Sequence, residues 1–288
     1  MSIGVEVRDA SVIAAAVDEQ GRVTARAAVE IQRDVVAAAT AALKRVWPKA
    51  NGSTPVAIAM PDSDSKVLQS LKSKYPQAVR IGCGTAAAVG ESWMGAAKGV
   101  ADVVYFGAEV HTTAGVIRGG RAAVGAHGHE PVIGWLALNP VEREDYRKSG
   151  CLEAEVAAAG IVRRLIWRIK AGDGSRVQDA VNGDLSAITY DLVVDAARAK
   201  DGVSISVMRD TAKYLGMAAA NLVIMGDPAT LVLGGIMASA GDLLLEPIIW
   251  ELGRRLPGPM MDALHIANAQ LGADAVVIGA ARYAALSA

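Results

Sequence analysis

Cysteine and aromatic residues are scarce in this sequence of 288 residues, which holds 2 Cys, 1 Phe, 5 Trp and 6 Tyr. Two cysteines cannot build a disulfide framework, and so few of them is typical of a reducing compartment. Aromatic residues make up 4 % of the chain, although hydrophobic residues make up 52 %. The core must therefore be packed mainly from Ala, Val, Leu and Ile.

An excess of charge of one sign is also missing. The 29 Lys and Arg residues nearly balance the 30 Asp and Glu residues, which leaves a formal net charge of −1. Proteins that bind nucleic acid through phosphate contacts need an excess of basic residues, so we expect no direct nucleic-acid partner. With 20 % charged residues and a hydrophobic majority, the chain is not disordered.

Hydrophobic runs long enough to cross a membrane are absent too. The mean hydropathy is +0.29, but the apolar stretch of residues 214–226 ends at Asp227, and the next one meets Asp242. Neither stretch reaches the roughly 18–20 residues of a membrane-spanning helix. The first eight residues, MSIGVEVR, lack the basic region and apolar run of a signal peptide. We therefore expect a cytoplasmic protein with no membrane partner.

Alternating strand and helix patterns fill the first hundred residues. Short β-branched runs between turn residues predict strands, and apolar positions spaced near 3.6 residues predict helices. The predicted strands cover residues 3–8, 12–17, 23–31, 56–60 and 79–81, and the predicted helices cover residues 34–47, 65–75 and 85–98.

The opening pattern then recurs. Residues 103–108 and 112–118 are apolar runs, and Gly119-Gly120 predicts a hairpin turn into residues 121–124. A strand meander followed by helices and strands thus occurs twice, with a boundary near residues 99–102. The remaining pattern predicts helices at 152–170, 189–199, 204–223, 241–254 and 275–286, and strands at 231–233 and 264–267. Because no linker separates the halves, we expect an α/β protein of two tightly joined lobes.

Four segments, in this order along the chain, resemble one known family. They are ADVVYFGAEVHTTAGVIRGGRAAVG at 101–125, GCLE at 150–153, TLVLGG with DLLLEP at 230–235 and 242–247, and LGADAVVIGAA at 271–281. In these segments the sequence resembles the ROK family of repressors and sugar kinases, part of the actin-like ATPase superfamily. The resemblance implies two ribonuclease-H-like lobes with an interlobe cleft. The first would comprise residues 1–100 with the returning helix 275–288, and the second residues 101–274.

The phosphate-binding turns of that family are altered here. Family members carry an acidic residue and a Gly-Gly-Thr-Lys turn after the first strand, where glycine lets backbone N–H groups approach a phosphate. Glu6 keeps the carboxylate, but Arg8 and Asp9 replace the glycines, and the second Gly-rich turn reads EVHTTAG at 109–115. Two like charges 4 Å apart repel by ~4 kcal/mol at an effective dielectric constant near 20. Asp9 and Glu109 therefore oppose a triphosphate.

The resemblance still places five residues on the nucleotide side of the cleft. They are Glu6, Thr112, Thr113, Gly234 and Gly235. Because the phosphate turns are altered, we expect no cofactor. Mg-ATP would be bound only if the protein is a divergent kinase.

The position of the family's catalytic base holds a cysteine. Family members carry Asn-Asp before an Ala-rich helix, and GCGTAAAVGE at 82–91 places Cys83 at the Asp position. The Asp accepts a proton from the attacking hydroxyl, whereas a thiol of pKa about 8.5 is mostly neutral at pH 7. A helix N-terminus lowers a thiol pKa, which would suit a nucleophilic or redox Cys83. We favour an inert small residue and assign no catalytic residue.

The family's structural zinc site is altered in the same way. It uses one His and three Cys, and the corresponding positions hold Trp135, Glu144, Tyr146 and Cys151. One thiolate cannot make a tetrahedral site. We therefore predict no structural zinc, no other metal and a buried Cys151.

Sugar-binding residues are only partly recognisable. Glu153 matches the glutamate of the family's Gly-Cys-Leu-Glu segment, which contacts sugar hydroxyls, whereas another family glutamate corresponds to Val132. Residues 127–130, HGHE, contain His129 and Glu130, which would offer polar groups to a ligand or half of a metal site, although a plain surface role is commoner. Asp62 lies where a family loop approaches the sugar.

Three functions follow from these observations. The first is a degenerate ROK protein that does not transfer phosphate and keeps its two-lobe clamp for ligand sensing, scaffolding or dimerisation. The second is a divergent ATP-dependent sugar kinase with Glu6, Glu91 or Glu109 as its base. The third is a sugar-responsive regulator without a DNA-binding domain of its own. The resemblance also implies a homodimer formed through the second lobe, with residues 215–223 and 248–250 as candidates, and a sugar or sugar-like ligand.

Overall fold

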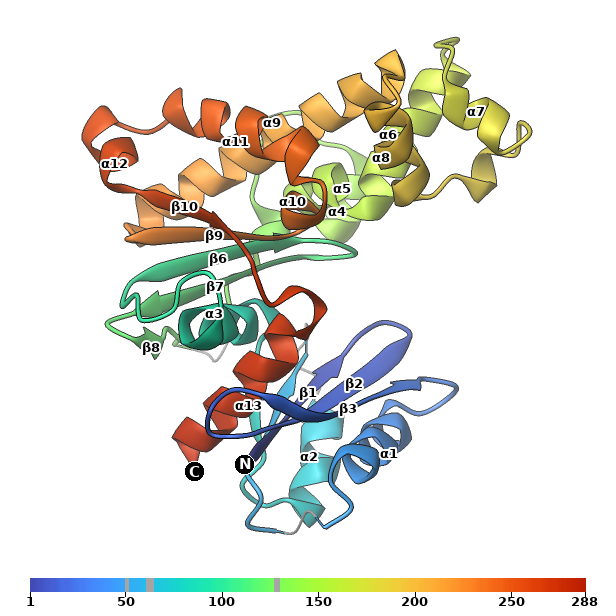
Figure 1. Cartoon of the computed structure of the whole chain (residues 1–288). Coiled ribbons are helices and arrows are strands. Elements are labelled where there is room, and N and C mark those ends of the chain that lie inside the picture. The colour runs from blue at the N-terminus through green and yellow to red at the C-terminus, as the bar shows by residue number, and fades with distance from the viewer. Residues whose placement is uncertain (50–51, 61–64, 127–129) are drawn as a thin grey trace.

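The computed structural model describes residues 1–49, 52–60, 65–126 and 130–288. In this part of the chain two five-stranded sheets occupy the lower and upper halves of the molecule (Figure 1). The order of the first sheet is β3-β2-β1-β4-β5, and that of the second is β10-β9-β6-β7-β8. Both sheets have helices on their outer faces, so each forms a lobe of its own.

The first sheet combines an antiparallel meander with two parallel strands. Its strands are β1 (Ser2–Val7), β2 (Ser11–Val17), β3 (Val23–Glu30), β4 (Val56–Ala59) and β5 (Val79–Ile81). Strand β2 reads as a continuous apolar run because helix α1 (Val35–Val46) covers one of its faces and helix α13 (Ala275–Ser287) the other. Helix α1 begins after Asp34, whose carboxylate accepts the N–H of Val36 at 2.9 Å. Helix α2 (Ser65–Lys74) packs beside α1.

The second sheet repeats the strand directions of the first. Its strands are β6 (Val103–Ala108), β7 (Thr112–Arg118), β8 (Arg121–Ala122), β9 (Thr230–Gly235) and β10 (His265–Asn268). Strands β6, β7 and β8 are antiparallel, and β9 and β10 run parallel to β6, as β4 and β5 do to β1. The recurrence read from the sequence is therefore a recurrence of sheet topology.

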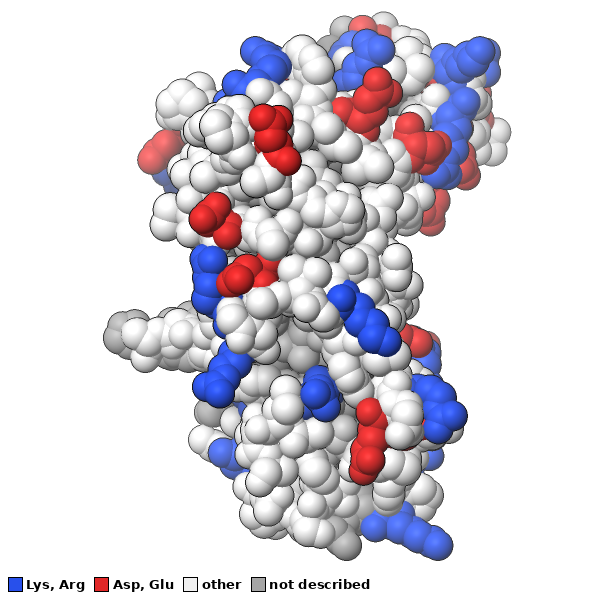
Figure 2. Space-filling view, turned by 60° about the vertical axis from the view of Figure 1, so that its left-hand side comes forward, with Lys and Arg blue, Asp and Glu red and all other residues white. Residues whose placement is uncertain are grey.

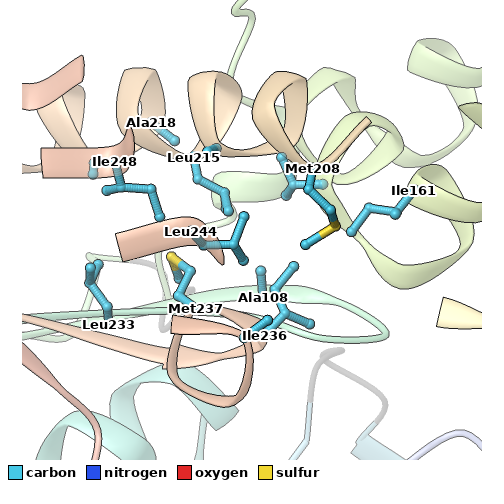
Figure 3. Close-up of a cluster of buried hydrophobic side chains, with 14 of the residues drawn as sticks. Ala108, Ile161, Met208, Leu215, Ala218, Leu233, Ile236, Met237, Leu244 and Ile248 are labelled. Carbon is cyan, nitrogen blue, oxygen red and sulfur yellow. The ribbon is translucent and has the colours of Figure 1, made fainter. Parts of the chain in front are cut away.

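Three helices contribute to the core above the second sheet. They are α9 (Gly202–Gly226), α10 (Ile236–Ser239) and α11 (Gly241–Gly253). Leu215 of α9 and Leu244 and Ile248 of α11 point toward Ile236 and Met237 of α10 (Figure 3). All five are at most 4 % exposed, and each buried Leu or Ile contributes about 1.5–3 kcal/mol to folding.

The upper part of the second lobe holds the remaining helices. They are α4 (Glu144–Ser149), α5 (Cys151–Val156), α6 (Ala158–Lys170), α7 (Arg176–Ala180), α8 (Tyr190–Arg198) and α12 (Gly258–Ala263). Short 3-10 turns lie at Ile133–Trp135, Leu185–Ala187 and Gly272–Asp274.

The prediction of a single helix over residues 152–170 was wrong, because the backbone is extended at Ala157 and separates α5 from α6. The break lets the N–H of Ala158 donate to the carbonyl oxygen of Glu109 at 2.9 Å.

Two helices fill the layer between the sheets. Helix α3 (Cys83–Met94) packs on β6 and β7, and α13 packs on β1 and β4 as well as on α3. Figure 1 shows the chain passing from β10 down to α13 in the lower half. Glu91 of α3 is fully buried and accepts the N–H groups of Ala96, Gln270 and Leu271, which holds the connection to α13 in place. Helix α3 precedes residue 100 in the chain but packs on strands of the second sheet. The predicted boundary between the lobes at residue 100 therefore stays a prediction.

Charged side chains of both signs occur on the face shown in Figure 2, with uncharged areas between them, in agreement with the nearly neutral net charge. Among the described residues, none of the helices combines the length and the apolar character needed to cross a membrane.

Candidate functional site

A cavity of about 660 Å³ opens between the lobes, where the β1–β2 turn approaches the β6–β7 turn. Helix α10 and the segment leading into α13 complete its wall. Its ionisable and hydroxyl-bearing lining residues are Glu6, Arg8, Asp9, Ser11, Cys83, Tyr105, Glu109, His111, Thr113 and Ser239. All other lining residues are Gly, Ala or Val. The cavity therefore presents a polar patch within small apolar walls.

The β1–β2 turn places an ion pair in this cavity. Glu6 is 7 % exposed, and Nη2 of Arg8 lies 2.8 Å from its Oε2 atom. The same nitrogen donates to the carbonyl oxygen of Ala273 at 3.2 Å, which ties the turn to the segment before α13. Burial raises the pKa of Glu6, and the Arg8 guanidinium opposes that rise. The charge of Arg8 is therefore already balanced.

A histidine joins the two turns across the cleft. Nε2 of His111 lies 3.1 Å from both carboxylate oxygens of Asp9, and Nδ1 lies 3.0 Å from Oε1 of Glu153 in α5. A carboxylate on each ring nitrogen favours the doubly protonated imidazolium. The contact with Glu153, and then that with Asp9, raises the pKa of His111 to about 9 against the effect of burial. We call Asp9, His111 and Glu153 the interlobe bridge.

Glu153 is also held by the β6–β7 hairpin. Its Oε2 atom accepts the N–H of Thr112 at 2.9 Å and the Thr112 hydroxyl at 3.1 Å. Burial alone would raise the pKa of Glu153, but the hydrogen bonds from His111 and Thr112 outweigh it and lower the pKa. Both carboxylate oxygens are thus engaged within the protein, and Glu153 does not line the cavity.

Glu130 occupies the N-terminus of α3. Its carboxylate lies against Gly82, where a Cβ atom would fall 1.8 Å from it, and its Oε2 atom is buried without a hydrogen-bond partner. Burial raises the pKa of Glu130 to about 6, although the nearby backbone N–H groups at the start of α3 oppose the rise. The first N–H groups of a helix are the ones that bind anions. Here the carboxylate of Glu130 already occupies this position.

Cys83 is a buried, neutral thiol. It is 8 % exposed, and burial raises its pKa, with the negative charges of Glu6 and Glu130 acting in the same direction. Thiolate is the reactive form of cysteine. A thiol held neutral in this way is a poor proton acceptor and a poor nucleophile.

Two further polar groups open onto the cavity beside the end of β9. The Tyr105 hydroxyl lies over Gly234, where a Cβ atom would fall 2.2 Å from it, and the Glu109 side chain lies beside Gly235. Gly235 has φ +63 and turns the chain from β9 into α10. Within the described chain, neither the Tyr105 hydroxyl nor the Glu109 carboxylate has a hydrogen-bond or ion-pair partner.

The region of the family's zinc ligands contains an ion-pair network. The Arg143 guanidinium lies 2.8 Å from Asp145 and 2.9 Å from Glu155, which is 2 % exposed. The Tyr146 hydroxyl donates to Glu155, and Cys151 is buried, as predicted. These residues do not fit a zinc site, because an indole (Trp135) and a phenol (Tyr146) stand where ligands are needed. No group of His, Cys, Asp and Glu residues in the described chain could hold a metal ion.

The structure brings together some of the predicted site residues. Glu6, Cys83, Thr113 and Gly235 line the cavity. Thr112 and Glu153 bond to each other behind it, and Gly234 lies under Tyr105. Glu130 caps α3, whereas Asp62 and His129 lie outside the described residues.

Sequence reasoning missed Tyr105 and the interlobe bridge. The signal for the bridge was present, because Asp9 and His111 occupy the first hairpin turn of each repeat. Equivalent turns of two facing lobes meet at the cleft, so opposite charges there predict a contact. The sequence contained no comparable signal for Tyr105, because this residue lies within the apolar run of β6 and resembled a core residue.

The sequence model of the ROK family matches residues 3–286. The chain belongs to the ROK family. Among curated ROK-like relatives, a glucokinase of Halalkalibacterium halodurans is 32 % identical over 196 residues, which cover 67 % of this chain and 59 % of the relative. The DNA-binding transcriptional dual regulator NagC of Escherichia coli is 29 % identical over 162 residues, covering 56 % of this chain and 38 % of NagC. The matches thus span between about two fifths and three fifths of these relatives.

Solved ROK structures share the fold. A ROK glucokinase from Streptomyces griseus, in complex with glucose and AMPPNP, superposes with a TM-score of 0.81 at 24 % identity and covers 99 % of both chains. A ROK transcriptional regulator homologous to the E. coli MLC protein superposes with a TM-score of 0.84 at 18 % identity, covering 99 % of this chain and 78 % of the regulator. The predicted two-lobe α/β fold is confirmed.

The solved ROK glucokinase from Streptomyces griseus holds AMPPNP, an analogue of ATP. In this ROK protein the first turn carries the Glu6–Arg8 ion pair, and the second carries Glu109 and His111, which is bound to Asp9. A phosphate would meet two carboxylates and no unpaired cation among the described lining residues. The residues present do not fit the phosphates of Mg-ATP.

Proposed function

We propose that this ROK protein binds a small ligand in the cavity between its lobes and does not transfer phosphate from ATP. The interlobe bridge carries the proposal, because it fills with side chains the two turns that bind phosphates in the family. A ROK protein that keeps its clamp in this way acts as a ligand-sensing, scaffolding or dimerisation module. We also propose that the protein binds no cofactor and no structural zinc.

Electrostatics supports the loss of ATP binding. A triphosphate in these turns would lie against Asp9 and Glu109 and would compete with Asp9 for His111. One such repulsion amounts to ~4 kcal/mol at 4 Å and an effective dielectric constant near 20. That energy corresponds to nearly three orders of magnitude in affinity.

The chemistry at Cys83 supports the loss of transfer. A sugar hydroxyl must lose its proton as it attacks phosphorus, and a carboxylate serves as acceptor. Cys83 is neutral because burial raises its pKa. The cavity remains open nonetheless, and the ROK structures solved with glucose and with sucrose favour a small polyhydroxylated ligand for it.

Calorimetry and a coupled assay test the proposal. We expect no heat with Mg-ATP and no ATP-dependent phosphorylation of glucose or N-acetylglucosamine. The double variant Asp9→Gly/Glu109→Gly should gain Mg-ATP binding, since it removes both repelling carboxylates. Phosphorylation of a hexose by the unchanged protein, lost in Cys83→Ala, would sink the proposal.

Glu130 favours a second candidate, a divergent ATP-dependent sugar kinase. Its carboxylate is next to Cys83, and a pKa of about 6 suits a general base near neutral pH. Three other carboxylates were candidates for the catalytic base. Glu6 and Glu109 line the cavity, whereas Glu91 does not line it and accepts hydrogen bonds from backbone N–H groups. If phosphorylation is detected, Glu130→Gln should abolish it, and unchanged turnover in that variant would exclude Glu130 as the base.

The likeness to NagC and to the MLC homologue supports a third candidate, a regulator that responds to a sugar through partner proteins. Basic and acidic residues nearly balance over the whole chain, with a formal net charge of −1, so we propose no direct DNA contact. A gel-shift assay at physiological salt tests this point, and a specific shift by the chain alone would contradict it.

A further inference from the structure

The cavity contains two polar groups that the protein itself leaves unused. Tyr105 is 8 % exposed, and its hydroxyl opens onto the cavity over Gly234. The Glu109 carboxylate reaches the same cavity beside Gly235. In the part of the chain that the structure describes, neither group has a hydrogen-bond or ion-pair partner. Glu109 is an exposed residue of the cavity lining, so its carboxylate is accessible to a ligand that enters the cavity.

The charges of the cavity do not balance. Its ionisable lining comprises the carboxylates Glu6, Asp9 and Glu109 against the cations Arg8 and His111. Both cations are already paired, Arg8 with Glu6 at 2.8 Å and His111 with Asp9 at 3.1 Å. The unbalanced charge is therefore the negative charge of Glu109.

The backbone fixes Glu109 in place. Its N–H donates to the carbonyl oxygen of His111 at 3.0 Å, and its own carbonyl oxygen accepts the N–H of Ala158 at 2.9 Å. The side chain passes so close to Gly235 that a Cβ atom there would fall 2.7 Å from Cγ of Glu109. This arrangement holds the carboxylate beside small apolar walls, where water is displaced by a ligand and an ion pair gains strength.

We infer that the cavity takes a small organic cation, in which a protonated amine pairs with Glu109 and a polar group of the ligand bonds to the Tyr105 hydroxyl. The inference rests on the proposed function, because a cavity that held a triphosphate would exclude this ligand. The inference goes beyond the proposed function because it specifies that the ligand is positively charged. Neutral ligands leave Glu109 unpaired, and anions are repelled by it.

A matched series of three sugars tests the charge. Glucosamine, glucose and glucose 6-phosphate share one ring and differ in carrying a positive, no or a negative charge, and each is titrated by calorimetry at pH 7. We expect glucosamine to bind at least roughly tenfold more tightly than glucose, the range of a hydrogen bond to a charged group. Glucose 6-phosphate should bind most weakly.

Two variants assign the contacts. Glu109→Gln should reduce the affinity for glucosamine to that for glucose, whereas Tyr105→Phe should weaken both sugars by a similar factor. Glu19→Gln, which changes an exposed carboxylate in the β2–β3 turn, serves as the control and should change neither affinity. Thermal unfolding of each variant confirms that the fold is kept.

Several outcomes would overturn the inference. They are equal affinity for the three sugars, tighter binding of the phosphate ester, no binding of glucosamine, and a preference for glucosamine that survives Glu109→Gln. Tight binding of MgCl2 or CaCl2 alone, lost in Glu109→Gln, would show a metal site instead. Titration with Mg-ATP separates the two proposals, since ATP binding with phosphorylation contradicts the proposed function, whereas no binding of either ATP or glucosamine contradicts only the inference.

Discussion

At the scale of single residues, the cleft of this ROK protein is defined by its charged side chains. In the proposed function, Asp9 and Glu109 stand in the turns that bind phosphates in the family, and Cys83 stands at the position of its catalytic base. The structure adds that these changes are mutually supporting. Asp9 pairs with His111 across the cleft, and the Glu130 carboxylate lies at the N-terminus of α3 beside Cys83. Glu109 remains without a partner among the described residues.

The interlobe bridge makes stability depend on pH. Contacts with Glu153 and Asp9 raise the pKa of His111 to about 9, above the value of about 6.5 for an unfolded histidine. A pKa raised by folding adds stability that is complete below the unfolded pKa and is lost as the pH rises through the folded one. We therefore expect His111→Gln to lower the unfolding midpoint clearly at pH 6, and to have little effect at pH 10.

Thermal unfolding between pH 6 and pH 10 measures this difference. His265→Gln, at an exposed position of β10, is the control and should follow the unchanged protein at every pH. A constant difference between His111→Gln and the unchanged protein across the range would contradict the role assigned to the imidazolium.

At the scale of elements, close approach of backbones joins the two lobes. A Cβ atom on Gly279 of α13 would fall 1.7 Å from the carbonyl oxygen of Ala86 in α3, and one on Gly84 would fall 2.2 Å from that of Ala114 in β7. Glycine at these positions lets α3 and α13 pack at backbone contact. The Ala-rich sequences of both helices predicted that they form helices, but did not predict which surfaces they pack against.

The variant Gly279→Ala tests this packing. Its added methyl group must push apart two helices in the layer between the sheets, and overpacking of this kind costs about 1–3 kcal/mol or more. Gly253→Ala, at the open end of α11 where nothing lies within 4 Å, is the matched control and should raise or keep stability because Ala favours a helix. Denaturant unfolding measures both, and equal stability of the two variants would contradict the packing.

At the scale of the whole molecule, the helices proposed for a dimer interface have two different faces. Leu215, Val223 and Ile248 are at most 1 % exposed and belong to the core of the second lobe. Met225 and Trp250, on the same helices, are 84 % and 63 % exposed. The outward face is therefore the part of α9 and α11 that remains available to a second copy.

Light scattering tests the predicted homodimer. We expect about twice the chain mass of 29.7 kDa, and a shift toward the monomer in Trp250→Lys, which places a charge on the apolar face. Val132→Lys, at a residue 62 % exposed on the loop before Ile133–Trp135, is the control. A monomer for the unchanged protein would show that the prediction is wrong.

The two repeated sheets could be predicted from the amino-acid letters alone, because hydrophobic periodicity and turn residues act over short distances along the chain. The changes in the phosphate turns and at the base position remain predictions, which rest on single letters such as Asp9 and Cys83. Only the tertiary structure decided which side chains meet. Asp9 and His111 are 102 residues apart, and Glu130 reaches α3 from a different loop. Contacts between distant segments depend on how the lobes pack, which local patterns do not encode.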